Sequence, residues 1–343
     1  MTQPAPTPLP AEDAPQPWDR AVPGGAFVLD QPDGIPAVWG HDSEVLWPLG
    51  EPLYIVGPAG AGKTTVAQQV ALARIGIRPA DVLGLPVNDD AGRLLYIAGD
   101  RPRQAARSMG RMVTDQDRDQ LDQRLTVWPG PLTFHLPTEP ERLLGMARHY
   151  QATTVVIDSL KDVANDLERP ETAAAVNSAL QHLVANDVEV AVLHHQRKAS
   201  GDNRKPTSLA DVYGGTWLTA GAGSVVLLWG DPGALAVDLT HLKQPAETVG
   251  PLTLLHDHDH GTTTVADKPD PLAILRRATK GISARTMAQA LTGNTDPNRD
   301  AVERARRQLE RLHRNGLATK RDGDKATNTP ALYLPATLLE DAA

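Results

Sequence analysis

The middle of the chain alternates short apolar runs with stretches of helical periodicity, which is typical of a mostly parallel sheet covered by helices. Buried strands are predicted at residues 53–56, 92–100, 153–158 and 188–193. Helices are predicted between them at residues 65–73, 102–113, 139–150 and 171–186. The predicted fold class is therefore α/β.

Shorter strands are expected on both sides of this region. Residues 26–50 are predicted to form short strands, with Trp39 and Trp47 as core or subunit-contact residues. Later strands, separated by tight turns, suggest antiparallel hairpins added to the parallel sheet at residues 224–229, 235–243, 252–256 and 262–266. Histidine and aspartate alternate from His256 to Gly261, and we interpret this run as a hairpin turn rather than a metal site.

Residues 268–336 form a separable unit with a different pattern. Its predicted elements are helices at 271–278, 283–291 and 298–314 and strands at 317–321 and 331–334. Ser283 is placed to cap the second helix. The longest helix has one apolar face and an opposite face with arginines, including Arg304, Arg307 and Arg311. The order is similar to a winged helix-turn-helix, which predicts a small α+β winged-helix domain.

The ends of the chain are predicted to be tails. Residues 1–24 contain seven prolines and few apolar residues, which indicates disorder, and residues 337–343 form a second tail. The larger domain is then expected to span residues 25–267. No apolar run approaches the roughly 18 residues of a membrane span. No basic-then-apolar segment resembles a secretory signal, so we expect no membrane partner and a cytoplasmic location.

Charge is unevenly distributed along the 343 residues. The chain is 41% hydrophobic and 22% charged, and its lack of cysteine excludes disulfides and thiolate metal sites. The net charge is −8, yet residues 268–335 carry 14 Lys and Arg against 7 Asp and Glu. A basic C-terminal unit beside an acidic larger domain indicates a polyanionic partner for the basic part.

A glycine-rich motif lies between the first long strand and the first helix. Its residues G-P-A-G-A-G-K-T-T fit the phosphate-binding P-loop pattern G-x-x-x-x-G-K-[ST]. Small side chains let backbone amides surround a polyphosphate, and the helix adds its positive N-terminal end. We predict ATP and Mg²⁺ as ligands, with Lys63 on the β- and γ-phosphates and Thr64 on the metal. The nucleotide-binding set is Gly57, Pro58, Ala59, Gly60, Ala61, Gly62, Lys63, Thr64 and Thr65.

Polar side chains follow three of the predicted strands. Asp158 closes an apolar run about 95 residues after Lys63, the Walker B pattern of a carboxylate delivered to the Mg²⁺ shell. Asp100 ends the second of these predicted strands. His194 and His195 follow the fourth, where they could contact the γ-phosphate; a capping or packing role for this pair stays open.

Basic side chains suggest surfaces for DNA. The long polar loop at 197–215 offers phosphate contacts from Arg197, Lys198, Arg204 and Lys205. The arginines of the C-terminal helix offer a second surface, with protein docking as the alternative role of that unit. A helix face with Arg103, Arg107 and Arg111 is interpreted as solvated, or else as a subunit or DNA contact.

Residues 35–267 resemble the RecA superfamily, in particular RepA-like and DnaB-like hexameric helicase ATPases. The resemblance rests on GPAGAGKTT at 57–65, LLYIAGD at 94–100, VVIDS at 155–159, LHHQRK at 193–198 and LKQPAE at 242–247. It implies a RecA-like fold, a homo-oligomer, specifically a hexamer, and single-stranded DNA in its pore. It also implies that Asp158 is the Walker B carboxylate and that His194 and His195 form the γ-phosphate sensor.

The sequence departs from these families at two positions. The carboxylate that orients the attacking water is usually glutamate, and Asp100, one methylene shorter, stands in its place. RepA-like proteins contribute an arginine from a neighbouring subunit, and this chain has no arginine in the corresponding stretch. DnaB-like proteins use a lysine and an arginine two positions apart; Lys243 matches the first and Pro245 stands at the second. Lys243 is therefore the first candidate and Arg197 the second. A basic residue supplied in this way, called a finger residue, increases the rate of hydrolysis by a factor of roughly 10³–10⁵.

These observations predict an ATP-hydrolysing motor that acts on DNA, most simply a replicative helicase-like ATPase. One alternative is a recombination or regulatory ATPase that binds DNA without unwinding it. Another is a nucleotide-gated DNA-binding module without turnover. A small-molecule kinase is not favoured, because no segment resembles a lid over an acceptor substrate.

Overall fold

The computed structural model describes residues 21–77, 80–195, 205–212, 216–266, 271–323 and 329–336. The chain divides into two compact units, Met1–Thr264 and Val265–Ala343, which are described separately below. Both predicted tails, apart from residues 21–24, lie outside the described residues, as do Arg197, Lys198 and Arg204. No helix in the described part of the chain is long and apolar enough to cross a membrane.

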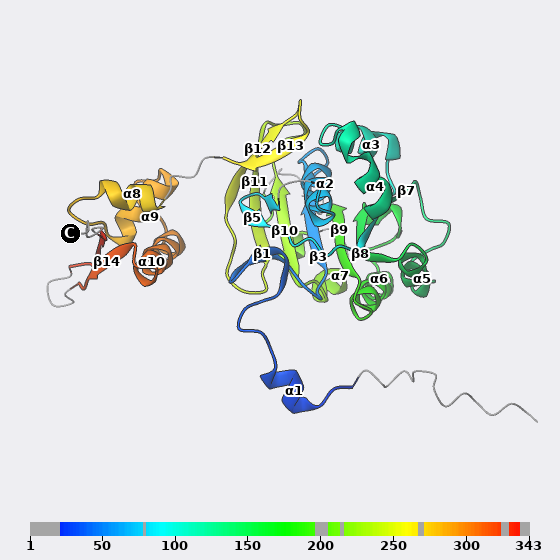
Figure 1. Cartoon of the computed structure of the whole chain (residues 1–343), viewed down its shortest axis with the longest axis horizontal. Helices are drawn as coiled ribbons and strands as arrows, with labels where there is room; N and C mark the ends of the chain where they lie inside the picture. Colours follow the sequence, from blue (N-terminus) through cyan, green and yellow to red (C-terminus); the bar gives the residue numbers. More distant parts are fainter. Residues whose placement is uncertain are drawn as a thin grey trace, which may run out of the picture. The chain divides into compact units, whose positions relative to one another are not determined.

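A sheet of nine strands, counted in the described residues, forms the centre of the first unit (Figure 1). Its strands are β3 (Leu53–Gly57), β6 (Arg93–Ala98), β7 (Leu125–Pro129), β8 (Ala152–Asp158), β9 (Glu189–His195), β10 (Ser224–Trp229), β11 (Ala236–Lys243), β12 (Leu252–Asp257) and β13 (Thr262–Val265). Their order across the sheet is β13-β12-β11-β10-β3-β9-β8-β6-β7. The six strands from β10 to β7 pair in parallel, and β11 is antiparallel to both of its neighbours. The predicted α/β class, with antiparallel strands added at the C-terminal end, is confirmed.

Helices pack on the sheet and fix which strand residues face the candidate site. They are α2 (Lys63–Arg74), α3 (Pro102–Gly110), α4 (Arg118–Arg124), α5 (Glu141–His149), α6 (Pro170–Val184) and α7 (Thr216–Ala220). The apolar core under α5 and α6 includes Val56, Ile97 and Val192 from the sheet. Because successive strand side chains point to opposite faces, Tyr96 and Asp158 lie on the other face, together with α2.

The N-terminal strands are partly as predicted. β1 (Ala37–His41) and β2 (Glu44–Pro48) form an antiparallel hairpin, and β4 (Asp81–Val82) pairs with β5 (Leu85–Pro86). Trp39 and Trp47 are fully buried in the core, and their indole nitrogens donate to main-chain oxygens at 2.9 and 3.2 Å. Burial of both rings stabilises the hairpin against the sheet.

The strand predicted at the start of residues 26–50 is wrong. Residues Gly24–Leu29 form helix α1, in which no residue is buried, and Phe27, Val28 and Leu29 are exposed. An apolar run forms a strand only when a neighbouring strand supplies hydrogen-bond partners. A helix supplies them locally instead: the Phe27 amide donates to Pro23 and the Asp30 amide to Ala26, at 3.0 and 3.2 Å.

The second unit contains three helices and a two-stranded antiparallel sheet within its described residues. These are α8 (Pro271–Arg277), α9 (Ala284–Thr292), α10 (Arg299–Arg314), β14 (Ala318–Arg321) and β15 (Leu332–Pro335). Leu275, Met287, Leu309 and Tyr333 pack in one core. Ser283 caps α9 as predicted, because its hydroxyl oxygen accepts from the Thr286 amide at 3.1 Å.

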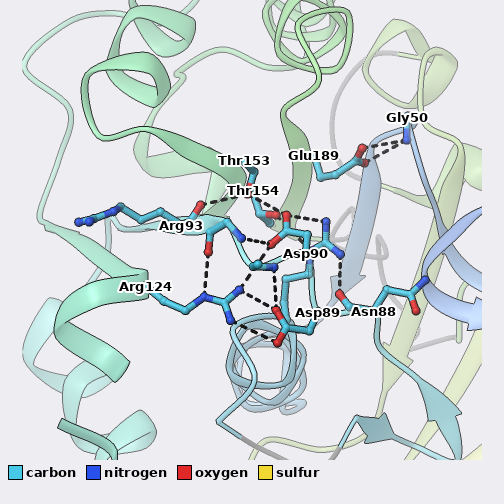
Figure 2. A network of polar contacts seen from close by, with 12 residues as sticks. Gly50, Asn88, Asp89, Asp90, Arg93, Arg124, Thr153, Thr154 and Glu189 are labelled. Carbon is cyan, nitrogen blue, oxygen red and sulfur yellow. Dashed lines mark hydrogen bonds and ion pairs between the residues drawn. The ribbon is translucent and has the colours of Figure 1, made fainter. Parts of the chain in front are cut away.

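A polar network occupies the amino ends of the parallel strands, at the edge of the sheet away from the P-loop (Figure 2). Arg74, the last residue of α2, is buried and pairs with Asp90 at 2.8 Å. Thr153 at the start of β8 donates to the same carboxylate at 2.7 Å. Arg124 pairs with Asp89 at 2.6 Å. These contacts fix the C-terminal end of the helix whose N-terminus follows the P-loop.

Candidate functional site

The predicted P-loop joins β3 to α2 and contains two glycines in an unusual backbone conformation. Gly60 and Gly62 have φ angles of +80° and +82°, in the left-handed region that glycine adopts without strain. Gly62 precedes α2, and no side chain caps the helix N-terminus. The first amides of α2 are therefore available to an anion.

The Lys63 side chain folds back into the P-loop and bonds its main chain. Its ammonium group donates to the carbonyl oxygens of Gly57 and Pro58, at 2.9 and 2.7 Å. Burial lowers the pKa of Lys63 to about 8, while the nearby Asp158 carboxylate acts to raise it. The cation therefore lies at the centre of the loop, where a phosphate would displace the two carbonyl contacts.

Asp158 lies beside the P-loop although its strand does not adjoin β3. Strand β9 lies between β3 and β8, and Thr64 reaches across to donate to Asp158 Oδ2 at 3.0 Å. The Tyr96 hydroxyl donates to the same oxygen at 2.8 Å. Burial raises the pKa of Asp158, and both hydrogen bonds oppose that rise. The hydroxyl and carboxylate oxygens that the sequence predicts as metal ligands are thus in direct contact.

Asp100 lies two residues beyond β6, at the same sheet edge as Asp158. The last residue of β6, Ala98, is paired with Asp158. The Asp100 carboxylate is half-exposed and lies 3.5 Å from the Lys161 ammonium group and 3.8 Å from Arg101 Nε. The exposed carboxylate is accessible to water and lies beside two cations.

The two histidines of β9 face different sides of the sheet. His194 is paired with Val56 and is fully buried on the α5–α6 face. His195 is paired with Gly57, the first P-loop residue, and lies on the other face. Burial and the charges of Lys63 and Lys161 lower the pKa of His195 to about 4. The structure therefore brings His195 alone of the pair to the P-loop face.

The predicted finger residue Lys243 is engaged within its own chain. Its ammonium group donates to the carbonyl oxygens of Thr219 and Ala220, at 3.3 and 3.0 Å, where α7 ends. Lys205, a predicted DNA contact, pairs with Asp238 of β11 at 2.8 Å. Each lysine would have to leave these partners to act on a neighbouring molecule.

The predicted DNA-contacting arginines of α10 share their face with an acid. Glu303 accepts from Arg306 at 2.6 Å and lies 3.6 Å from Arg307. Arg311 is exposed and Arg304 is half-buried. Part of the positive charge of this face is therefore balanced within the helix.

The geometry of the P-loop fits a nucleoside triphosphate with Mg²⁺. Gly60 and Gly62 adopt left-handed φ angles, the Lys63 cation lies inside the loop, and the Thr64 and Asp158 oxygens meet beside it. Oxygen atoms are the ligands that Mg²⁺ prefers, and the ion usually keeps several waters besides one or two carboxylates. Thr64 and Asp158 would hold the metal, directly or through water, and the metal would supply positive charge to the phosphates.

Sequence reasoning missed two residues of this site. Tyr96 stands in an apolar strand run, and its hydroxyl gave no signal because a tyrosine in a strand usually packs. Lys161 lies three residues after Asp158. Its closeness in sequence to that carboxylate is the one feature that could have indicated a place in the site. Both belong to the site because they contact the two carboxylates placed at the sheet edge.

Comparison with known proteins supports this assignment of the P-loop. Residues 43–201 match a family model described as "AAA domain", which supports an ATPase core. No curated protein matches the chain. Among solved structures the chain is similar to "ATPase Domain of G40P", with 14% identity, a TM-score of 0.46, and coverage of 63% of this chain and 85% of that chain.

Proposed function

We propose that the chain is an ATP-hydrolysing RecA-type motor that acts on DNA as a homo-oligomer, specifically a hexamer of the RepA or DnaB kind. The contact between Thr64 and Asp158, 3.0 Å long and beside Lys63, carries the proposal. It joins the two halves of a nucleotide site that lie 94 positions apart in sequence. The AAA-domain match over the same residues supports it.

The chemistry proposed is in-line attack of water on the γ-phosphate. Lys63 stabilises the charge that spreads over the phosphate oxygens in the transition state. Asp100 orients the attacking water. His195, on the P-loop face of β9, contacts the γ-phosphate and relays its presence to the loop that follows β9. A basic residue from a neighbouring subunit, Lys243 or Arg197, completes the site.

The DNA part of the proposal rests on charge. Residues 268–335 carry twice as many basic as acidic residues, and the order of their elements supports a winged-helix domain. Arg304, Arg307 and Arg311 on α10 would contact duplex phosphates. Lys205, with Arg197, Lys198 and Arg204, would contact single-stranded DNA in the pore of the ring.

Steady-state ATP hydrolysis, measured with and without single-stranded DNA, tests this proposal. We expect hydrolysis that DNA stimulates in the native protein. Strand separation on a forked duplex then selects a helicase, whereas stimulated hydrolysis without separation selects the recombination or regulatory ATPase. Absence of nucleotide binding would refute the proposal.

A second candidate, the nucleotide-gated module without turnover, is favoured by one observation. Asp100 is shorter than glutamate and lies 3.5 Å from Lys161, which restrains it. Binding of ATP without hydrolysis, on added DNA as well as without it, would select this candidate.

Replacement of Asp100 by asparagine is expected to lower kcat by roughly 10²-fold while ATP affinity is retained, because a general base contributes about that factor. Asp100→Glu, which restores the longer side chain, is expected to keep hydrolysis. Glu168→Gln, at an exposed carboxylate after β8, is the matched control. Equal kcat in Asp100→Asn and the control would remove Asp100 from the mechanism.

A further inference from the structure

We propose that His256 is a positioning residue for the P-loop, which it braces from the β12–β13 hairpin so that the loop keeps the shape that receives phosphate. This inference rests on the proposed binding of nucleotide at that loop.

The imidazole of His256 lies directly over Gly62. The side chain is 8% exposed, and a Cβ atom placed on Gly62 would lie 2.1 Å from Cε1 and 2.4 Å from Nε2 of the ring. The ring therefore fills the space that a glycine leaves at this position. Its Nε2 edge lies near the backbone of Ala61 without forming a hydrogen bond of normal geometry, so the ring contacts the loop by packing.

Hydrogen bonds that run through Thr263 to helix α2 hold the ring in place. His256 Nδ1 and the Thr263 hydroxyl are 2.7 Å apart. The main chain of Thr263 in β13 exchanges two hydrogen bonds with Gln69, of 2.8 and 3.2 Å. Gln69 belongs to α2, the helix that begins at Lys63. The path therefore runs from the helix through both strands of the hairpin and returns to the loop at Gly62.

Restricting the loop would favour ligand binding because the loop contains flexible glycines. Gly60 and Gly62 lose more conformational freedom on ordering than other residues do. A loop that is already ordered before it binds does not lose that entropy again on binding, and its ligand binds more tightly. The ring over Gly62 restricts the residue whose amide and neighbour, Lys63, face the phosphates.

Titration with fluorescent ADP and ATP analogues, on the full chain, tests the proposal. His256→Ala is expected to weaken both nucleotides by a similar factor of roughly tenfold, because the loop amides serve ADP and ATP alike. KM for ATP should rise by that factor with kcat changed less. His260→Ala, an exposed histidine of the same hairpin, is the control and should leave both constants unchanged.

The His256→Asn variant distinguishes a role of His256 in shaping the P-loop from a role in stability alone. Asparagine keeps an atom at the position that bonds Thr263 but lacks Cε1 and Nε2, the atoms over Gly62. We expect it to resemble His256→Ala in nucleotide affinity and the native protein in its unfolding midpoint. Native affinity in both variants would overturn the proposal.

A double-mutant cycle tests the contact without nucleotide. Gly62→Ala clashes with the ring, so it should lower the unfolding midpoint more in the native background than in His256→Ala; additive shifts would refute the contact. If the native protein binds no nucleotide, the proposed function fails and this inference with it. If the native protein binds and His256→Ala binds equally well, only the inference fails.

Discussion

Replacing Lys63 by alanine is expected to lower ATP hydrolysis by at least about 10²–10³-fold, the factor that follows from loss of one preorganised charge donor. Lys63 Nζ lies within 3 Å of two loop carbonyl oxygens, so it is already inside the space that a phosphate would occupy. Alanine removes the cation that neutralises the phosphates. ATP affinity is expected to fall together with kcat, and both are measured on the same preparations.

The pH dependence of nucleotide affinity gives this prediction a second readout. Burial lowers the pKa of Lys63 to about 8, so the free protein loses this cation as the pH rises through that value. Affinity of the native protein for ATP should therefore decrease above pH 8, and the Lys63→Ala variant should show no such decrease. Lys280→Ala, at an exposed lysine of the second unit, is the control. Equal hydrolysis in the native and Lys63→Ala proteins would contradict the assignment of the loop.

Replacing Asp90 by alanine is expected to lower the free energy of unfolding of the first unit by about 3–5 kcal/mol, as for other broken buried ion pairs. Arg74 is 4% exposed, and its charge would be left without the carboxylate that lies 2.8 Å away. Figure 2 shows that Asp90 is also the centre of the network, where Thr153 and Arg124 converge. Its loss therefore affects the C-terminal ends of α2 and α4 and the start of β8 at once.

Asp89 offers a matched control for that experiment. Its carboxylate pairs with Arg124 at 2.6 Å but is 44% exposed, so Asp89→Ala should cost roughly 1 kcal/mol or less. All six tryptophans lie before residue 265, so their fluorescence during urea unfolding reports on the first unit alone. The double replacement Arg74→Met with Asp90→Leu should be less harmful than Asp90→Ala, because the buried Arg74 charge is removed together with the carboxylate that pairs with it. Equal costs for Asp89→Ala and Asp90→Ala would contradict this account.

Local patterns were sufficient to predict most of the elements. The strand before Gly57, the strand that closes on Asp158 and the amphipathic helix α10 each carry their own signal in spacing and side-chain type. The edge strand β7 gave no such signal, because its residues are only half-buried and its apolar run is short. The helix α1 has an apolar run without a partner strand, which pattern alone cannot distinguish from a strand.

The arrangement of the candidate site depended on contacts that sequence spacing does not encode. Strand order places β9 beside the P-loop strand, and the packing of α5 and α6 against Val56 and Val192 decides that His195, rather than His194, lies on the P-loop face. The contacts of Lys161 with Asp100 and of His256 with Gly62 join residues 61 and 194 positions apart. Such pairs become visible only when the sheet and its crossovers are in place.

The last strand of the sheet is also the exit from the first unit. β13 ends at Val265, the residue at which the second unit begins. Tension applied to the second unit would therefore enter the first unit at β13. Thr263, two residues before Val265 on the same strand, bonds the ring that lies over Gly62. A mechanical pull at one end of the molecule would thus be delivered to the turn that cradles phosphate.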